Sequence, residues 1–353
     1  MTTSTHTQAP DDAAIKNERA PGQLTRSKTR LPHEPAVRKL AGVHAAGAPA
    51  GVHLTSLGST QPVTAAAIRS PAPRAEQDAY ADLLRPGVRR FIWVAFVLAI
   101  ANGVFLYFLP ARAETEYAWA IRPPVNAAFM GAGYLSGVLA TGLGLFAVRY
   151  WRSVWSQFWS FFTITSVELL ATLLHADRFR WDYWPTWLWT AVYVAVPPAI
   201  VLLWLWQQRS VHKQPPMDAR LAPIKAISWV LGGGVALFGA LLFLTPQTFI
   251  PHWPWDITPL MARAVSAWYL QMGATLLFAA ATLRQAHEAL IPYSWLAAIN
   301  GLVLLLPILH ASTVRAGSPE FWFWLVMHAV LFAGAAWATT RSLSGMRRAH
   351  QRI

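Results

Sequence analysis

Three polar side chains fall on one face of an otherwise apolar stretch: Glu168, Thr172 and His175. Offsets of four and seven residues place them in a single stripe of a helix. A carboxyl, a hydroxyl and an imidazole in one stripe can pass protons or bind a cation. A charge near the middle of a bilayer costs roughly 2.5–3.5 kcal/mol, so Glu168 is the first candidate functional residue. The alternative is that Glu168 is protonated, or hydrogen-bonded to a neighbouring helix, and only holds a helix bundle together.

A second group of candidates contains the cationic and imidazole side chains of other apolar stretches. Arg263 is the expected partner of Glu168, although its long side chain can also reach the polar interface. His310 and His328, together with His175, can ligate a metal ion or haem, or titrate near neutral pH. Histidines at helix ends more commonly make interfacial hydrogen bonds, so the sequence leaves the identity of any cofactor open.

The chain consists mainly of apolar stretches, and these stretches must position the candidate residues. Of its 353 residues 55% are hydrophobic and 13% charged, which excludes an ordinary soluble domain. A helix of about 20 residues crosses the hydrocarbon core of a bilayer. Such stretches are predicted near residues 90–109, 125–148, 157–176, 184–206, 226–245, 259–282, 290–310 and 319–340. We therefore expect an all-α integral membrane protein with eight transmembrane helices, and the lipid bilayer is its first partner.

The net charge of +13 lies mostly in the two tails and in the loops that follow every second predicted helix. These segments all lie on the same side of the membrane. Lys and Arg are retained on the cytoplasmic side of short loops, so both termini are expected there, in the cell inner (cytoplasmic) membrane. The basic residues are scattered over loops without a reading motif, which argues against a nucleic-acid partner. The chain has no cysteine, which excludes disulfides and thiolate metal sites.

The sequence also repeats itself. Many residues recur about 136 positions later (229 − 93 = 136), and after a slip of one residue the offset becomes 135. The matching pairs are Trp93/Trp229, Gly103/Gly239, Pro110/Pro246, Trp119/Trp255, Ile121/Ile257, Pro123/Pro259, Arg149/Arg284, His175/His310, Trp187/Trp322 and Trp189/Trp324. Four helices return the chain to its starting side, so we expect two parallel four-helix repeats. The residue of the second repeat that corresponds to Glu168 is Val303, so the acidic side chain is not duplicated.

The predicted organisation follows from these patterns. Residues 1–84 are rich in Ala, Pro, Thr, Ser and Gly and are expected to form a disordered cytoplasmic tail. The first repeat covers 85–206, a cytoplasmic linker covers 207–225, the second repeat covers 226–340, and a basic cytoplasmic tail covers 341–353.

Two motifs resemble those of a group of bacterial multi-pass membrane proteins that has no established activity. One runs from Trp119 (WAIRPP) to Tyr134, and the other is Leu173 to Phe179 (LLHADRF). The resemblance covers roughly residues 88–340 and implies a bacterial inner-membrane location. It marks His175, Asp177, Tyr134 and the Pro123-Pro124 pair as the positions to test.

No phosphate loop, dinucleotide fingerprint, nucleophile elbow or HExxH helix is present, so the sequence favours a protein that is not an enzyme. The leading hypothesis is a cavity between the repeats, open to the outer face, that binds or translocates a small molecule or ion. A membrane redox, haem or metal enzyme that uses the three histidines is one alternative. The other is a structural or sensory subunit that docks a cytoplasmic protein through residues 1–84.

Overall fold

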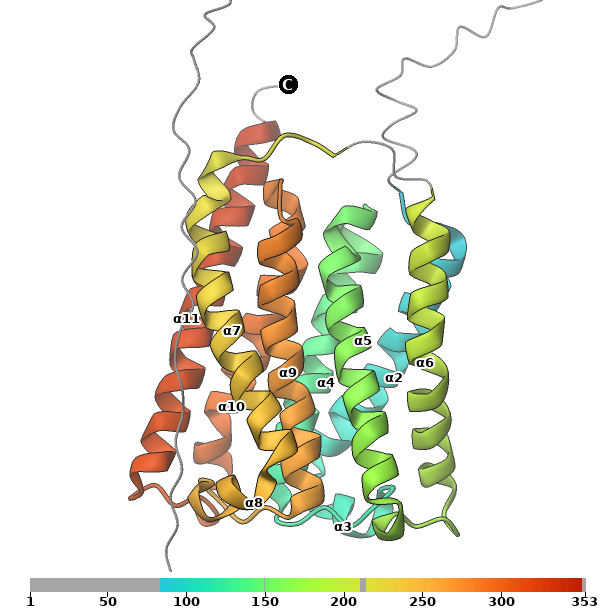
Figure 1. The fold of residues 1–353 in the computed structure, drawn as a ribbon, viewed down its shortest axis with the longest axis vertical. Coiled ribbons are helices and arrows are strands. Elements are labelled where there is room, and N and C mark those ends of the chain that lie inside the picture. Colours follow the sequence, from blue (N-terminus) through green and yellow to red (C-terminus); the bar gives the residue numbers. More distant parts are fainter. Residues whose placement is uncertain (1–82, 149, 210–213, 351–353) are drawn as a thin grey trace, which may run out of the picture. The chain divides into compact units, whose positions relative to one another are not determined.

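The computed structural model describes residues 83–148, 150–209 and 214–350. Within them, eight helices are long and apolar enough to cross a membrane, and no strand is assigned. They are α2 (Pro86–Phe108), α4 (Pro124–Gly142), α5 (Trp151–Leu174), α6 (Trp184–Gln208), α7 (Ala222–Leu244), α9 (Pro259–Thr282), α10 (Leu290–Leu309) and α11 (Pro319–His350) (Figure 1). A π-helical turn, η2 (Leu143–Ala147), continues α4. The expected all-α integral membrane fold is confirmed.

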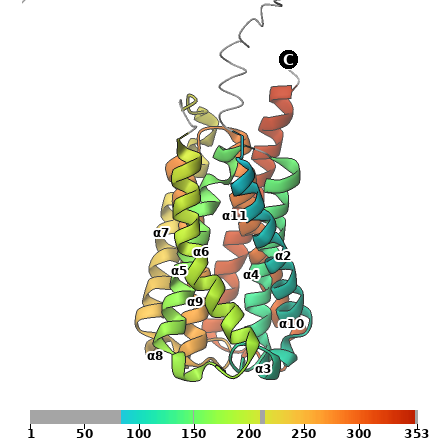
Figure 2. The same ribbon diagram turned by 90° about the vertical axis from the view of Figure 1, so that its right-hand side faces the viewer.

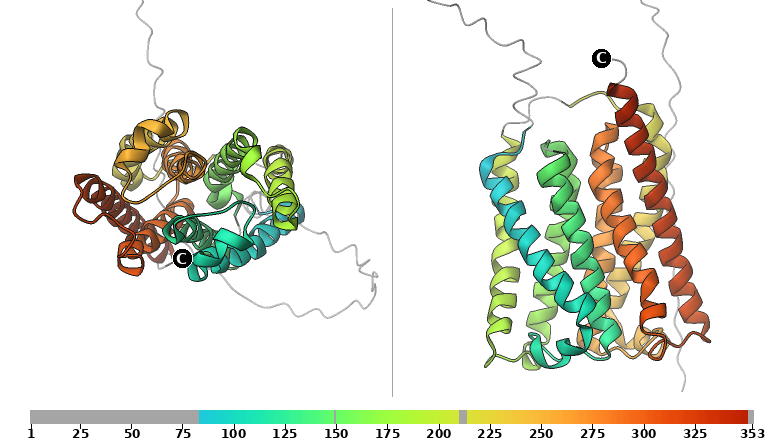
Figure 3. Two further views of the ribbon diagram at one scale, coloured as in Figure 1. Left: turned by 90° about the horizontal axis from the view of Figure 1, so that it is seen from below. Right: turned by 180° about the vertical axis from the view of Figure 1, so that it is seen from behind.

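The eight helices run up and down, so Pro86 and His350 lie at the same end of the bundle (Figures 1 and 3). We call this end the termini side. The opposite end, the loop side, carries two short helices, α3 (Ala113–Glu116) and α8 (Pro246–Phe249). Single turns lie beside them or end the neighbouring helices: η1 (Pro110–Arg112), η3 (Ala176–Arg178) and η5 (Ile250–His252).

Seen along the helix axes, α2, α4, α5 and α6 lie together on one side, and α7, α9, α10 and α11 lie on the other (Figure 3). Within the first group α2 packs on α4 and α5 on α6; within the second α7 packs on α9 and α10 on α11. The most extensive contacts between the groups are those of α5 with α9 and of α10 with α4. Helix α9 is the most enclosed, because 78% of its most apolar window is buried.

Close packing of α2 on α4 depends on a glycine. A Cβ atom at Gly131 would run into the backbone of Leu106 and Tyr107 on α2. A Cβ atom at Gly133, two residues later, would run into the ring of Trp268 from α9. Glycine at these two positions therefore lets α4 approach a helix of each group.

Two boundaries differ from the sequence prediction. Helix α5 begins at Trp151 rather than near residue 157, because Arg152 is paired inside the protein with Glu288 and its charge does not end the helix. Helix α11 continues through most of the predicted basic tail, to His350. The predicted linker contains the end of α6, a turn, η4 (Ala219–Leu221), and the first residues of α7. Arg149 and the predicted tail up to residue 82 lie outside the described residues.

Candidate functional site

The main cavity lies among the helices of the first group. Its volume is about 450 Å³, and α2, α4, α5 and α6 supply most of its wall. Helices α9 and α10 close its back with Trp268, Gln271, Ile291 and Trp295. The sequence analysis expected a cavity between the two sets of four helices. The cavity instead lies mainly within the first set, because the contacts of α5 with α9 and of α4 with α10 fill the space between the sets.

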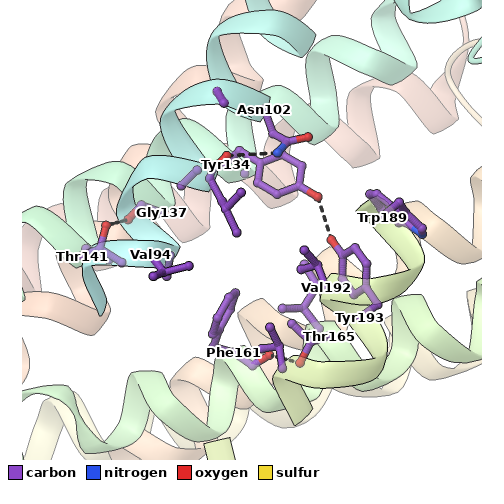
Figure 4. A pocket seen from close by; sticks show the side chains of 18 of the residues that line it. Val94, Asn102, Tyr134, Gly137, Thr141, Phe161, Thr165, Trp189, Val192 and Tyr193 are labelled. Atoms are coloured by element: carbon purple, nitrogen blue, oxygen red, sulfur yellow. Dashed lines mark hydrogen bonds between the residues drawn. The ribbon is translucent and has the colours of Figure 1, made fainter. Parts of the chain in front are cut away.

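Two tyrosine hydroxyls meet at the wall of this cavity. Tyr134 of α4 and Tyr193 of α6 are hydrogen-bonded, with 2.7 Å between their oxygens (Figure 4). The indole of Trp189, one turn before Tyr193 on α6, packs against the Tyr193 ring at a centroid distance of 4.2 Å. Tyr134 also contacts the Trp268 ring of α9, 5.1 Å away and nearly perpendicular. Aromatic packing on both sides therefore fixes the orientation of the hydroxyl pair.

A third tyrosine closes the loop side of the cavity. Tyr117, which follows α3, donates a hydrogen bond to Oδ1 of Asn102 on α2 over 3.4 Å. Burial raises the pKa of Tyr117 well above its usual value, and the neighbouring Tyr134 and Glu168 raise it further. The three tyrosines and Glu168 thus form one electrostatically connected cluster, in which Tyr117 keeps its proton at neutral pH.

Glu168 lies behind the cavity wall rather than in it. Its side chain is 1% exposed, and its Oε1 has no hydrogen-bond partner among the described residues. The hydroxyl of Thr172 donates to the backbone carbonyl of Glu168 over 2.8 Å and accepts from Nε1 of Trp189 over 2.9 Å. Thr172 therefore positions Trp189, and of the predicted stripe only Glu168 has a fully buried side-chain polar atom without a partner.

Arg263 contacts His175 instead of its predicted partner Glu168. Its Nη1 lies 2.7 Å from Nε2 of His175, and its Nε donates to the carbonyl of Phe243 over 3.1 Å. A guanidinium has only donors, so Nε2 of His175 must be unprotonated and accept. Burial, followed by the charge of Arg263, lowers the pKa of His175, whereas Asp177 opposes this shift. The expected link of Arg263 to Glu168 is therefore replaced by a contact at the end of α5.

His328 is held by a hydrogen-bond chain inside the second group. Its Nδ1 lies 2.7 Å from Oδ1 of Asn300, and its Nε2 lies 3.0 Å from the hydroxyl of Tyr269. The Asn300 oxygen can only accept, so Nδ1 donates and Nε2 accepts from Tyr269. Nε1 of Trp324 donates to the Tyr269 oxygen over 2.9 Å. Both ring nitrogens of His328 are therefore in use, and neither is free to ligate a metal ion.

The remaining predicted residues lie apart from these clusters. Asp177 is exposed and pairs with the neighbouring Arg178 at 3.0 Å. His310 caps the end of α10, and burial lowers its pKa. In the part of the chain that the structure describes, no group of three His, Asp or Glu side chains that could hold a metal ion is found. The three predicted histidines are thus not gathered into one ligand set.

A second, shallower pocket of about 340 Å³ lies on the loop side of the second group. Its wall is largely aromatic, and Nδ1 of His252 lies 3.3 Å from Oε1 of Glu320 within it. The wall consists of Phe238, Phe249, His252, Trp253, Pro254, Pro319, Glu320, Phe323, Trp324 and Met327.

Sequence reasoning singled out Tyr134 but not the residues around it. In the sequence, Tyr193 is the counterpart of His328, and Asn102 is a polar residue in an apolar helix. No spacing or motif in the sequence connects either of them with Tyr134. Their meeting depends on how α2, α4 and α6 pack. The chain matches no protein-family model, no curated protein and no solved structure.

Proposed function

We propose that the protein binds a small molecule in the main cavity, either to retain it or to move it across the membrane. The observation that carries this proposal is a cavity of about 450 Å³ with an apolar wall and one converging pair of hydroxyls, Tyr134 and Tyr193. Small-molecule sites typically have volumes of about 300–1,000 Å³, apolar walls and a few polar groups that fix orientation.

The proposed orientation places the termini side in the cytoplasm of a bacterial cell. Charges on the loop side nearly cancel, whereas basic residues predominate on the termini side, as the retention of Lys and Arg in the cytoplasm requires. The described basic residues of the termini side include Arg85, Arg89, Arg90, Arg152, Arg209, Arg220, Lys225, Arg284 and Arg341. The hydroxyl pair then lies near the middle of α4 and in the half of α6 that is nearer the outer face.

We also propose that the two groups of helices are duplicated copies of one four-helix unit. Packing supports this, because α2 on α4 corresponds to α7 on α9, and α5 on α9 corresponds to α10 on α4. Hydrogen bonds support it too. The pair Tyr134–Tyr193 corresponds to Tyr269–His328, since both numbers rise by 135 (269 − 134 and 328 − 193).

The two cavities occupy corresponding places in this scheme. Tyr117 and Asn102 of the main cavity correspond to Trp253 and Phe238 of the second pocket, each 136 positions later (253 − 117 and 238 − 102). Larger aromatic rings therefore replace the polar groups of the first copy. This difference supports a ligand site in the first copy and a supporting role for the second.

Occupancy of the cavity tests the proposed function. The protein would be purified in a mild detergent, and native mass spectrometry would be used to look for a bound small molecule. Gly137 lines the cavity, and a Cβ there meets only Ala99, so Gly137→Leu fills the space without a backbone clash. Gly233→Leu is the matched control, because a Cβ at Gly233 has no neighbour within 4 Å and the residue does not line the cavity.

We expect wild type and Gly233→Leu to retain the bound molecule, and Gly137→Leu to lose it. A second variant, Glu168→Gln, is expected to alter the amount bound, because it changes the one unpartnered carboxyl beside the tyrosine cluster. Equal occupancy in wild type and Gly137→Leu would overturn the proposed site. Unchanged occupancy in Glu168→Gln would remove Glu168 from the site and leave the cavity in place.

A further inference from the structure

The main cavity is exposed between two helices of the first group. Four wall residues on these two helices are themselves exposed: Val94 and Ala101 on α2, and Trp184 and Leu188 on α6. The exposed fractions of Val94, Trp184 and Leu188 are 59%, 68% and 46%. Figure 2 shows α2 and α6 on the same face of the bundle. The mouth of the cavity is therefore a gap in the wall that α2 and α6 form.

These two helices are joined at the termini side. The backbone N–H of Arg85 donates to Oε1 of Gln207 over 2.9 Å, and the guanidinium of Arg85 lies 5.0 Å from the centre of the Trp206 ring. Further from that end, α2 packs on α4 and α6 packs on α5. The opening thus begins below a fixed junction and lies within membrane-spanning segments Pro86–Phe108 and Trp184–Gln208. At this depth the surroundings are lipid chains, so a molecule reaches the mouth from the bilayer.

The charge of the wall limits which molecule can bind. Among the described wall residues the only ionisable acid or base of the Asp, Glu, Lys, Arg and His types is Glu116, which lies at the loop side, 3.9 Å from Arg112. Deeper in the cavity no charged wall residue can compensate the charge of an ionised ligand. Because an uncompensated charge in an apolar site is strongly unfavourable, the wall selects an uncharged molecule.

The hydroxyl pair supplies the polar contact. One O–H proton is used between Tyr134 and Tyr193, and the pair holds a second one. An oxygen atom of a ligand can accept this proton, while the apolar remainder lies along Phe91, Leu98 and Phe161.

We propose that the ligand is an uncharged amphiphile dissolved in the membrane, with an apolar chain or ring and a terminal hydroxyl or carbonyl oxygen. It passes from the bilayer between α2 and α6 and binds with its oxygen at Tyr134 and Tyr193. This inference rests on the proposed function of the main cavity and adds the chemical class of the ligand and its route.

The test uses the full chain in phosphatidylcholine nanodiscs and a 12-carbon alcohol that carries a photoreactive diazirine in its chain. We expect cross-links to wall residues of α2, α4, α5 and α6. Unlabelled dodecanol is expected to compete at least tenfold better than dodecanoate or dodecylammonium. Competition by dodecylammonium as strong as that by dodecanol would overturn the requirement for an uncharged ligand.

The hydroxyl contact has its own variants. Tyr134→Phe and Tyr193→Phe each remove an O–H without changing the ring, and competition by dodecanol is expected to weaken about threefold to tenfold, as the loss of one hydrogen bond predicts. The control is Tyr293→Phe, which removes a buried hydroxyl that pairs with Ser228 outside the cavity. Unchanged competition in both cavity variants would overturn the assigned polar contact.

The route is tested at the mouth. Ala101→Trp places a large ring in the gap and is expected to slow labelling at short exposure times, with less effect on the final extent. Ala329→Trp on α11 makes the same change on an exposed surface away from the cavity. Equal labelling rates in Ala101→Trp and wild type would overturn the lateral route. If Gly137→Leu labels as wild type does, the proposed cavity itself fails, which separates that result from an error in ligand class or route.

Discussion

The guanidinium of Arg152 donates from Nε to Oε1 of Glu288 over 2.7 Å, and this ion pair joins α5 to η6 (Ala286–Ala289), the turn before α10. Both side chains are less than a tenth exposed. The other oxygen of Glu288 accepts the backbone N–H groups of Arg284 and Gln285, at 2.6 Å and 3.2 Å. The pair therefore links the two groups of helices on the termini side.

Removal of one member of this pair leaves the other charge buried and unpaired. Arg152→Met is expected to lower the free energy of unfolding by about 3–5 kcal/mol. Arg178→Met is the control, because Arg178 pairs with Asp177 at the surface, and it should change stability by less than about 1 kcal/mol. Unfolding in mixed micelles with increasing SDS measures both. An Arg152→Met protein as stable as wild type would show that the pair contributes nothing.

Gly131→Ala tests the close approach of α2 to α4. The added methyl group meets the backbone of Leu106 and Tyr107, so the helices must separate. Overpacking of this kind typically costs about 1–3 kcal/mol. Gly234→Ala, on α7, adds a methyl group with no neighbour within 4 Å and should be neutral or slightly stabilising. The same unfolding measurement compares the two, and equal stabilities would contradict the assigned packing role.

His328→Leu tests the hydrogen-bond chain of the second group. The change leaves Oδ1 of Asn300 without its donor and the O–H of Tyr269 without its acceptor, at a cost of about 1–3 kcal/mol for each group. His310→Leu, at the end of α10, is the control and should stay within about 0.5 kcal/mol of wild type. A His328→Leu protein with wild-type stability would mean that the chain does not hold α9, α10 and α11 together.

The contact between Arg263 and His175 predicts a dependence of stability on pH. The pKa of His175 is lower in the folded protein than its ordinary value of 6.5, so between these two values the unfolded chain binds more protons. The contribution of the neutral His175 to stability is therefore fully present at pH values above 6.5. It is lost as pH falls through the lower pKa of the folded protein. Thermal unfolding at a series of pH values should show this loss in wild type.

His175→Gln provides the matched comparison, because glutamine can still accept from Arg263 but does not titrate. The loss of stability on acidification should therefore be smaller in this variant than in wild type. Identical pH profiles would show that His175 does not contribute to the dependence.

The sequence alone determined the class of the fold. Eight apolar stretches of spanning length predict eight helices, because a backbone in lipid must satisfy its own hydrogen bonds. It also singled out Glu168, since a charged side chain is conspicuous in an apolar helix, and Tyr134, through the motif that contains it. The even number of helices predicted that both described ends lie on one side.

Only the tertiary structure decided which of these residues meet. Arg263 and Glu168 were natural partners by charge, but the packing of α5 on α9 brings Arg263 to His175. Arg152 and Glu288 lie outside the apolar stretches predicted from the sequence, yet the structure buries them as an ion pair between α5 and η6. Tyr134 and Tyr193 are 59 residues apart, and only the packing of four helices makes them the polar end of a cavity. Helix periodicity defines faces within a segment, whereas contacts between segments depend on side-chain shape across all of them.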